Sequence, residues 1–95
     1  MTSKKIKREP SKGHEKEVYE DYLLILHNDD VHSFDYVIEA LVELCEHSYE
    51  QAVQCTHIAH HKGSCDIRKG ELKKLKPIKD ALSERELITT IELQP

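Results

Sequence analysis

The sequence is poor in the residues that build large cores and rigid scaffolds. Its 95 residues include no Trp, one Phe, three Gly and three Cys. So few large aromatic side chains predict a small, aliphatic core. An odd number of cysteines, with no close pair along the chain, fits a reducing compartment better than a disulfide scaffold. No apolar stretch approaches membrane-spanning length, and no apolar segment follows the basic N-terminus as in a signal peptide. We therefore expect a cytoplasmic domain.

Acidic residues outnumber basic ones. Lys and Arg number 14 against 18 Asp and Glu, which gives a formal net charge of −4. Nucleic-acid-binding domains are normally basic, so no nucleic-acid partner is expected. The three glycines are isolated, so there is no phosphate-binding loop, and neither a cofactor nor an enzymatic activity is predicted. Residues 1–17 have almost no apolar side chains, which predicts a flexible tail before a single core domain at 18–95.

The periodicity of apolar residues predicts an α+β fold with the order β-α-α-β-α-β. An unbroken apolar run ends at Leu26 and indicates a central strand buried on both faces. Ser33 and Ser48 are good helix N-caps, Ser48 with Gln51 at capping-box spacing. We expect a three-stranded sheet packed against three helices. The expected strands are residues 20–27, 64–68 and 87–93; the expected helices are 34–46, 48–62 ending at Gly63, and 71–85 with a kink or restart at Pro77.

Polar side chains are concentrated at 27–33, between the strongest strand signal and the strongest helix signal. The segment reads His-Asn-Asp-Asp-Val-His-Ser. Asn-Asp-Asp is ordinary turn chemistry, because short polar side chains bond to nearby backbone. A loop held between two rigid elements is also where binding residues usually lie. Its row of acceptors would suit a cationic donor.

The layout and its motifs resemble the ClpS family of protease adaptors. The resemblance covers about residues 20–93 and rests on Asn28-Asp29-Asp30, Val37, the Ala59-His60-x-x-Gly63 helix ending and the last strand at 87–92. It implies a monomeric adaptor that binds proteins through a bulky hydrophobic N-terminal residue, such as Phe, Leu, Tyr or Trp. The adaptor would deliver them to the N-terminal domain of a Clp-family AAA+ unfoldase and its protease.

The resemblance also assigns roles to residues. Asn28, Asp29 and His60 would hold the α-amino group of the substrate. Asp30 would support the peptide backbone, and Glu71 and Lys76 would fall on the surface that meets the unfoldase. The remaining assigned residues would line the side-chain pocket: His32, Phe34, Val37, Thr56, Ala59 and Leu87.

Chemistry agrees with this assignment. An ammonium group offers three donors and a charge to an amide oxygen, a carboxylate and a neutral imidazole nitrogen. A site that requires a free amine rejects internal residues, whose amide nitrogen has one donor and no charge.

Where the family often has a pocket-rim Met and a small Thr, this chain has Phe34 and His32. Thr56 and Ala59 stand in place of larger apolar residues.

The sequence is also compatible with a second class of function, that of a small His-rich metal-binding or regulatory module. His57 and His61 share a helix face, with Cys65 nearby in sequence, a pattern that could bind zinc or nickel. Exposed surface histidines are the plainer interpretation of the pair, and no metal is predicted. Cys45 and Cys55 lie on apolar helix faces, which favours buried structural thiols over nucleophiles.

Overall fold

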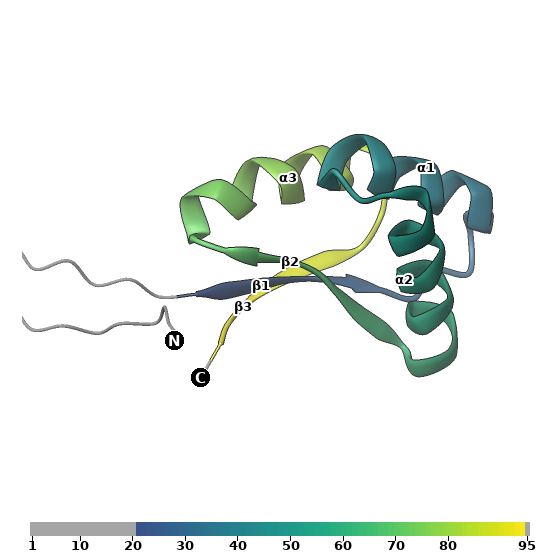
Figure 1. The fold of residues 1–95 in the computed structure, drawn as a ribbon, viewed down its shortest axis with the longest axis horizontal. Coiled ribbons are helices and arrows are strands. Elements are labelled where there is room, and N and C mark those ends of the chain that lie inside the picture. The colour runs from purple at the N-terminus through teal and green to yellow at the C-terminus, as the bar shows by residue number, and fades with distance from the viewer. Residues whose placement is uncertain (1–20, 95) are drawn as a thin grey trace, which may run out of the picture.

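A computed structural model describes residues 21–94, which form one small three-stranded antiparallel sheet with three helices (Figure 1). The central strand is β1 (Tyr22–His27), flanked by β2 (Ser64–Gly70) and β3 (Thr89–Leu93). The predicted α+β class and element order are confirmed. As the apolar run predicted, β1 is central and buried: Leu24 and Leu26 join the main core, and Ile25 is buried outside that cluster.

The pairing of β1 with β2 contains one irregularity. Leu24 lies opposite Arg68 and Ile25 opposite Asp66, so Ile67 is the extra residue of a bulge. Bulges locally bend a strand and redirect its side chains. Here the Arg68 guanidinium donates to the Cys45 carbonyl over 2.8 Å. The second strand is thereby tied to the end of the first helix.

Capping residues set the starts of the first two helices, α1 (Phe34–Cys45) and α2 (Tyr49–Lys62). The Ser33 hydroxyl accepts the Tyr36 N–H of α1. Ser48 and Gln51 form the predicted capping box at the start of α2. Gly63 ends α2 with a φ of 99°, a left-handed conformation that glycine adopts without steric cost.

The helices are arranged around one face and one end of the sheet. Figure 1 shows α3 (Leu72–Glu84) along one face, and α2 at the far end of the sheet from the start of α3. The three-residue link from α1 to α2 turns through Glu46, whose φ is 59°. In Figure 1, α2 lies at a steep angle to α1. Leu41, Leu75 and Leu82 fill the core between helices and sheet.

Most element bounds lie within two residues of the expected ones, and the main differences concern α3, β2 and β3. No interruption occurs at Pro77, because α3 is one helix from Leu72 to Glu84. Proline removes one backbone donor, but Lys73 and Pro77 are both exposed, so the carbonyl left without its helical partner lies on the solvent side. Strand β2 continues to Gly70, two residues beyond the predicted end, because Gly70 still pairs with Tyr22. Strand β3 starts at Thr89, two residues later than predicted.

The tail predicted for residues 1–17 lies outside the described residues. Within 21–94, no helix combines the length and the apolarity needed to cross a membrane.

Candidate binding pocket

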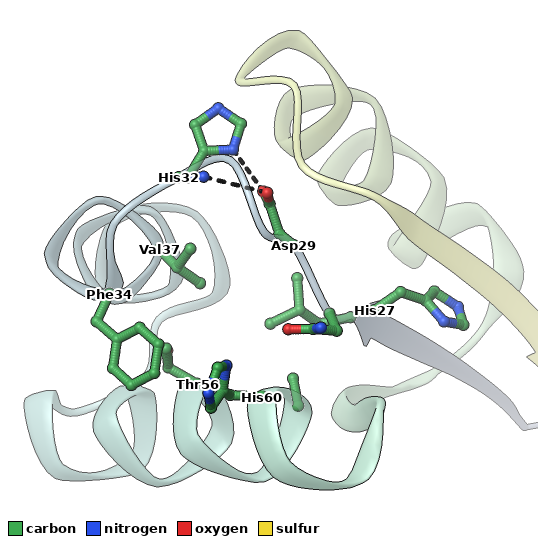
Figure 2. A pocket seen from close by; sticks show the side chains of 10 residues that line it. His27, Asp29, His32, Phe34, Val37, Thr56 and His60 are labelled. Atoms are coloured by element: carbon green, nitrogen blue, oxygen red, sulfur yellow. Dashed lines mark hydrogen bonds and ion pairs between the residues drawn. The ribbon is translucent and has the colours of Figure 1, made fainter.

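A pocket opens where the end of β1, the loop into α1 and the α2 helix meet (Figure 2). It has a volume of about 290 Å³, part of it open to solvent. So small a hollow suits a single side chain better than a large ligand. The lining residues are Leu26, His27, Asn28, Asp29, His32, Phe34, Val37, Thr56, Ala59 and His60.

Asp29 organises the loop on one side of the pocket. Its Oδ1 accepts the backbone N–H groups of Val31 and His32, at 2.7 and 3.1 Å, and its Oδ2 contacts the Nδ1 of His32. Burial by itself raises the pKa of this carboxyl. The hydrogen bonds from His32 and Val31 outweigh burial and hold the pKa below its ordinary value. Asp29 is therefore a fixed negative charge beside the pocket.

His32, the partner of Asp29, is held from its other side by an aromatic contact. Its ring stacks on Tyr36 with centroids 4.6 Å apart, and the Tyr36 hydroxyl donates to the Arg85 carbonyl. This chain of contacts links the loop to the segment that follows α3. His32 thus positions Asp29, a role that its place in the sequence did not predict.

Asn28 is fixed through its backbone and keeps an acceptor available. Its N–H donates to the Gly63 carbonyl at the end of α2, over 2.9 Å. Its side-chain nitrogen donates to Asp30 Oδ1 over 3.4 Å. Within residues 21–94 the Asn28 side-chain oxygen accepts no hydrogen bond. A donor on a ligand could therefore bind to it.

The α2 wall of the pocket is built from small residues. Ala52, Thr56 and Ala59 are the buried residues of this helix. The Thr56 hydroxyl donates to the Ala52 carbonyl over 2.8 Å, so its hydrogen-bonding need is met within the helix. Thr56 and Ala59 both line the pocket, and their short side chains leave the space that a larger residue would fill.

Aromatic rings border the pocket above α2. The ring of Phe34 meets His57 and His60 edge-on, with centroids 4.9 and 5.1 Å away. In Figure 2 the Phe34 side chain reaches from the start of α1 down toward α2, next to His60. His60 is exposed and makes no hydrogen bond with the described residues. Its imidazole is thus a second available acceptor.

The structure brings eight of the predicted site residues to this one pocket. They are Asn28, Asp29, His32, Phe34, Val37, Thr56, Ala59 and His60. Asp30 is exposed beside it and bonds to the Asn28 side chain. Glu71 and Lys76 lie elsewhere, Glu71 as the N-cap of α3 and Lys76 exposed within that helix.

The pocket lining differs from the predicted set at three residues. Leu87 is 3% exposed and belongs to the core cluster, and it is not among the residues that line the pocket. Leu26 and His27 line the pocket without having been predicted. Their position directly before Asn28 was the available signal. The His27 ring points away toward β3 in Figure 2, where its Nε2 lies 2.8 Å from Thr90 Oγ1.

The side chains considered for a metal site do not converge. The His57 and His61 rings stack with centroids 6.3 Å apart, and Cys65 is buried against Cys55. In the described part of the chain, no three His, Cys, Asp or Glu side chains are grouped so that they could hold a metal ion. The pocket described above is therefore the better-formed candidate site.

Comparison with known proteins identifies the family. The family model described as ATP-dependent Clp protease adaptor protein ClpS matches residues 17–88. ATP-dependent Clp protease adapter proteins ClpS from two Campylobacter jejuni strains, RM1221 and 81-176, are each 42% identical over 64 residues. That match covers 63% of this chain and 67% of theirs.

A solved structure agrees with the sequence matches. Agrobacterium tumefaciens ClpS2 bound to L-phenylalaninamide superposes with a TM-score of 0.68 at 25% identity. The superposition covers 79% of this chain and 98% of ClpS2. The family match, the related sequences and the shared fold lead to one conclusion: this chain belongs to the ClpS family of adaptors of ATP-dependent Clp proteases.

Proposed function

We propose that this adaptor binds the free α-amino group and the bulky hydrophobic first residue of N-degron proteins. Phe, Leu, Tyr and Trp are the proposed first residues. The bound protein is then delivered to a Clp-type ATP-dependent unfoldase and its protease. One observation carries the proposal: two available acceptors and a fixed carboxylate lie beside a small, mostly apolar pocket.

The proposed polar contacts match the chemistry of an ammonium group. The Asn28 side-chain oxygen and a neutral His60 nitrogen each accept one N–H. Asp29 adds negative charge, although both of its oxygens already bond within the loop. Each carboxylate oxygen has a second lone pair, so Asp29 can also accept from the amine. The relative that holds L-phenylalaninamide binds a compound with a free amine and an aromatic side chain.

The apolar part of the pocket distinguishes the first side chain of a substrate only by its size and hydrophobicity. Leu26, Val37 and Ala59 present no group that could recognise a particular side chain by a hydrogen bond. Phe34 is the residue proposed to limit entry, because its ring lies against His57 and His60 at the border of the pocket. Rotation of this half-buried ring about its side-chain bonds would widen the opening.

Calorimetric titration tests the binding proposal. A decapeptide beginning with Phe is compared with the same peptide acetylated at its N-terminus and with one beginning with Ser. Acetylation removes the charge and two of the three donors, so affinity should fall about tenfold or more. The Ser peptide should bind weakly because it leaves the apolar walls unfilled. Equal affinity for the free and acetylated peptides would refute amine recognition.

Delivery requires more than binding, and the segment before residue 17 is proposed to serve it. Removal of residues 1–16 should leave peptide affinity unchanged, because no lining residue is lost. Degradation of a model N-degron substrate by the assembled unfoldase and protease should slow.

A double variant of Glu71 and Lys76, each changed to Ala, tests the proposed unfoldase surface in the same assay. If substrate turnover were unchanged in both the truncated protein and the double variant, neither residues 1–16 nor Glu71 and Lys76 would contribute to delivery.

A further inference from the structure

Two cysteines that are ten residues apart in sequence meet in space, and neither of them lines the pocket. Cys55 lies on α2 and Cys65 on β2, and their Sγ atoms are 3.0 Å apart. Both are free thiols. Helix α2 ends at Gly63, and the chain reverses there into β2, which brings the two residues together. The third cysteine, Cys45 on α1, has no such partner among the described residues.

The two thiols differ in environment. Cys65 is buried, whereas Cys55 is partly exposed. The Cys65 thiol donates toward the Cys55 sulfur, and both sulfurs lie near the Asp66 carbonyl, at 3.7 Å from Cys55 and 3.5 Å from Cys65. Burial, together with the neighbouring Cys55, raises the pKa of Cys65 to about 12. Cys55 is therefore the thiol that a reagent from solvent reaches first.

We propose that Cys55 and Cys65 are a redox modification site that closes reversibly to an intramolecular disulfide linking α2 to β2. The oxidant is a peroxide. The Cys55 thiolate attacks one peroxide oxygen, an S–O bond forms, the O–O bond breaks, and the leaving hydroxide takes up a proton to become water. The sulfur of Cys65 then attacks the sulfenic sulfur of Cys55. The S–S bond forms, the S–O bond breaks, and the hydroxyl leaves as water with the proton of Cys65.

The geometry favours this outcome over further oxidation of Cys55. A sulfenic acid with a thiol in contact condenses to a disulfide, whereas an isolated one proceeds to sulfinic acid. The two sulfurs already touch, so only a small movement separates contact from bond. The closed disulfide fastens the helix that carries Thr56 and Ala59 to an edge strand of the sheet. A cross-link of this kind restricts the unfolded chain and stabilises the fold.

The test uses the full chain treated with hydrogen peroxide, then alkylated, digested and analysed by mass spectrometry. The treated protein should lose the mass of two hydrogen atoms and yield one cross-linked peptide that contains Cys55 and Cys65. Its melting temperature should rise by roughly 10–20 °C. A thiol reductant should reverse both changes. Cys45→Ala serves as the matched control and should cross-link like the unmodified sequence.

Cys55→Ser should abolish the cross-link and the rise in melting temperature. This position is partly exposed, so the variant is expected to fold. Two results would overturn the proposal. One is sulfinic acid at Cys55 while Cys65 stays fully alkylatable; the other is a cross-link between different molecules.

Discussion

Helices α1 and α2 are similar in length but contribute differently to the molecule. The buried face of α1 contains Val37, Ile38, Ala40, Leu41 and Cys45, mostly large apolar side chains that fill the core. The buried face of α2 contains only Ala52, Thr56 and Ala59. The exposed face of α2 includes His57, His60 and His61. Helix α1 therefore packs tightly against the core, whereas α2 leaves space beside its short side chains.

The difference explains why the pocket lies where it does. Large side chains on a helix close the gap to its neighbours, and protein interiors are packed without voids. Short ones keep the gap open where the backbone is held by other contacts. Helix α2 is held by its capping box at one end, and at the other by the Gly63 carbonyl, which accepts the Asn28 N–H. Substitutions at core positions of α1 such as Leu41 should therefore change stability, and those at the pocket-lining positions of α2 should change binding.

Leu41→Ala on α1 should have the largest effect and act on stability. Leu41 is fully buried, so the change leaves a cavity and should lower the free energy of unfolding by about 2–5 kcal/mol. Urea denaturation measures the loss. Val42→Ala, an exposed change on the same helix, should cost under about 0.5 kcal/mol. Similar losses in the two variants would contradict the packing role assigned to α1.

Asn28→Ala and His60→Ala should act on binding. Each removes a proposed acceptor for a charged amine, so the binding free energy for a Phe-initiated peptide should weaken by roughly 1.5–3 kcal/mol. The backbone bond from Asn28 to Gly63 survives the first change, and His60 is exposed, so the fold should persist. Calorimetry measures affinity, and circular dichroism checks folding. His61→Ala, on the same helix and outside the pocket lining, is the matched control. If His61→Ala weakened binding as much as His60→Ala, His60 would not be a direct ligand.

Ala59→Leu places on α2 the kind of large apolar side chain that fills the core along α1. Ala59 is 3% exposed and lines the pocket, so leucine would occupy the space reserved for a ligand. Affinity for a Phe-initiated peptide should weaken, because the leucine and the peptide side chain compete for the same space; overfilling a packed site typically costs about 1–3 kcal/mol. Competition with a fluorescent peptide measures this change. Ile58→Ala, at an exposed neighbour, should leave affinity unaltered. Tighter binding by Ala59→Leu would mean that the pocket is too large as it stands.

The smallest effect is expected from the pH dependence of stability through Asp29. Its pKa is lower in the folded than in the unfolded chain, where a free Asp has a pKa of about 3.9. Folding is therefore stabilised above that pH, and the contribution is lost as the pH falls through the folded value. Between about pH 5 and pH 3, the unmodified protein should lose more stability than Asp29→Asn. Urea midpoints at both pH values measure this, and parallel losses would show that Asp29 makes no such contribution.

Local signals made most of the fold predictable. The apolar run at 22–26, the two serine caps and Gly63 identify elements through interactions within a few residues. The adjacency of Asn28 and His60 was not visible in periodicity and came from the family resemblance. Leu87 shows the limit: an apolar residue predicts burial, but the sequence does not say whether it faces the core or a pocket.

Contacts between distant segments were the least predictable. Cys55 and Cys65 looked unpaired because they belong to different elements, and only the reversal of the chain at Gly63 brings them together. The effect of Pro77 was overestimated because a helix tolerates a missing donor when the carbonyl it would have bonded lies on the solvent side. Asp29 and His32 were predicted as ligand contacts, yet their mutual contact also determines the shape of the loop.

The bond from Asn28 to the Gly63 carbonyl extends the pairing of β1 and β2 by one step, since His27 already lies opposite Ser64. The amide proton of Asn28 should therefore exchange with solvent on the timescale of sheet opening and not of loop motion. Because Asn28 is already held in place, it loses little conformational entropy when a ligand binds. A smaller part of the binding free energy is then offset by ordering the protein. Heating or denaturant that loosens the sheet edge would weaken recognition before the core unfolds.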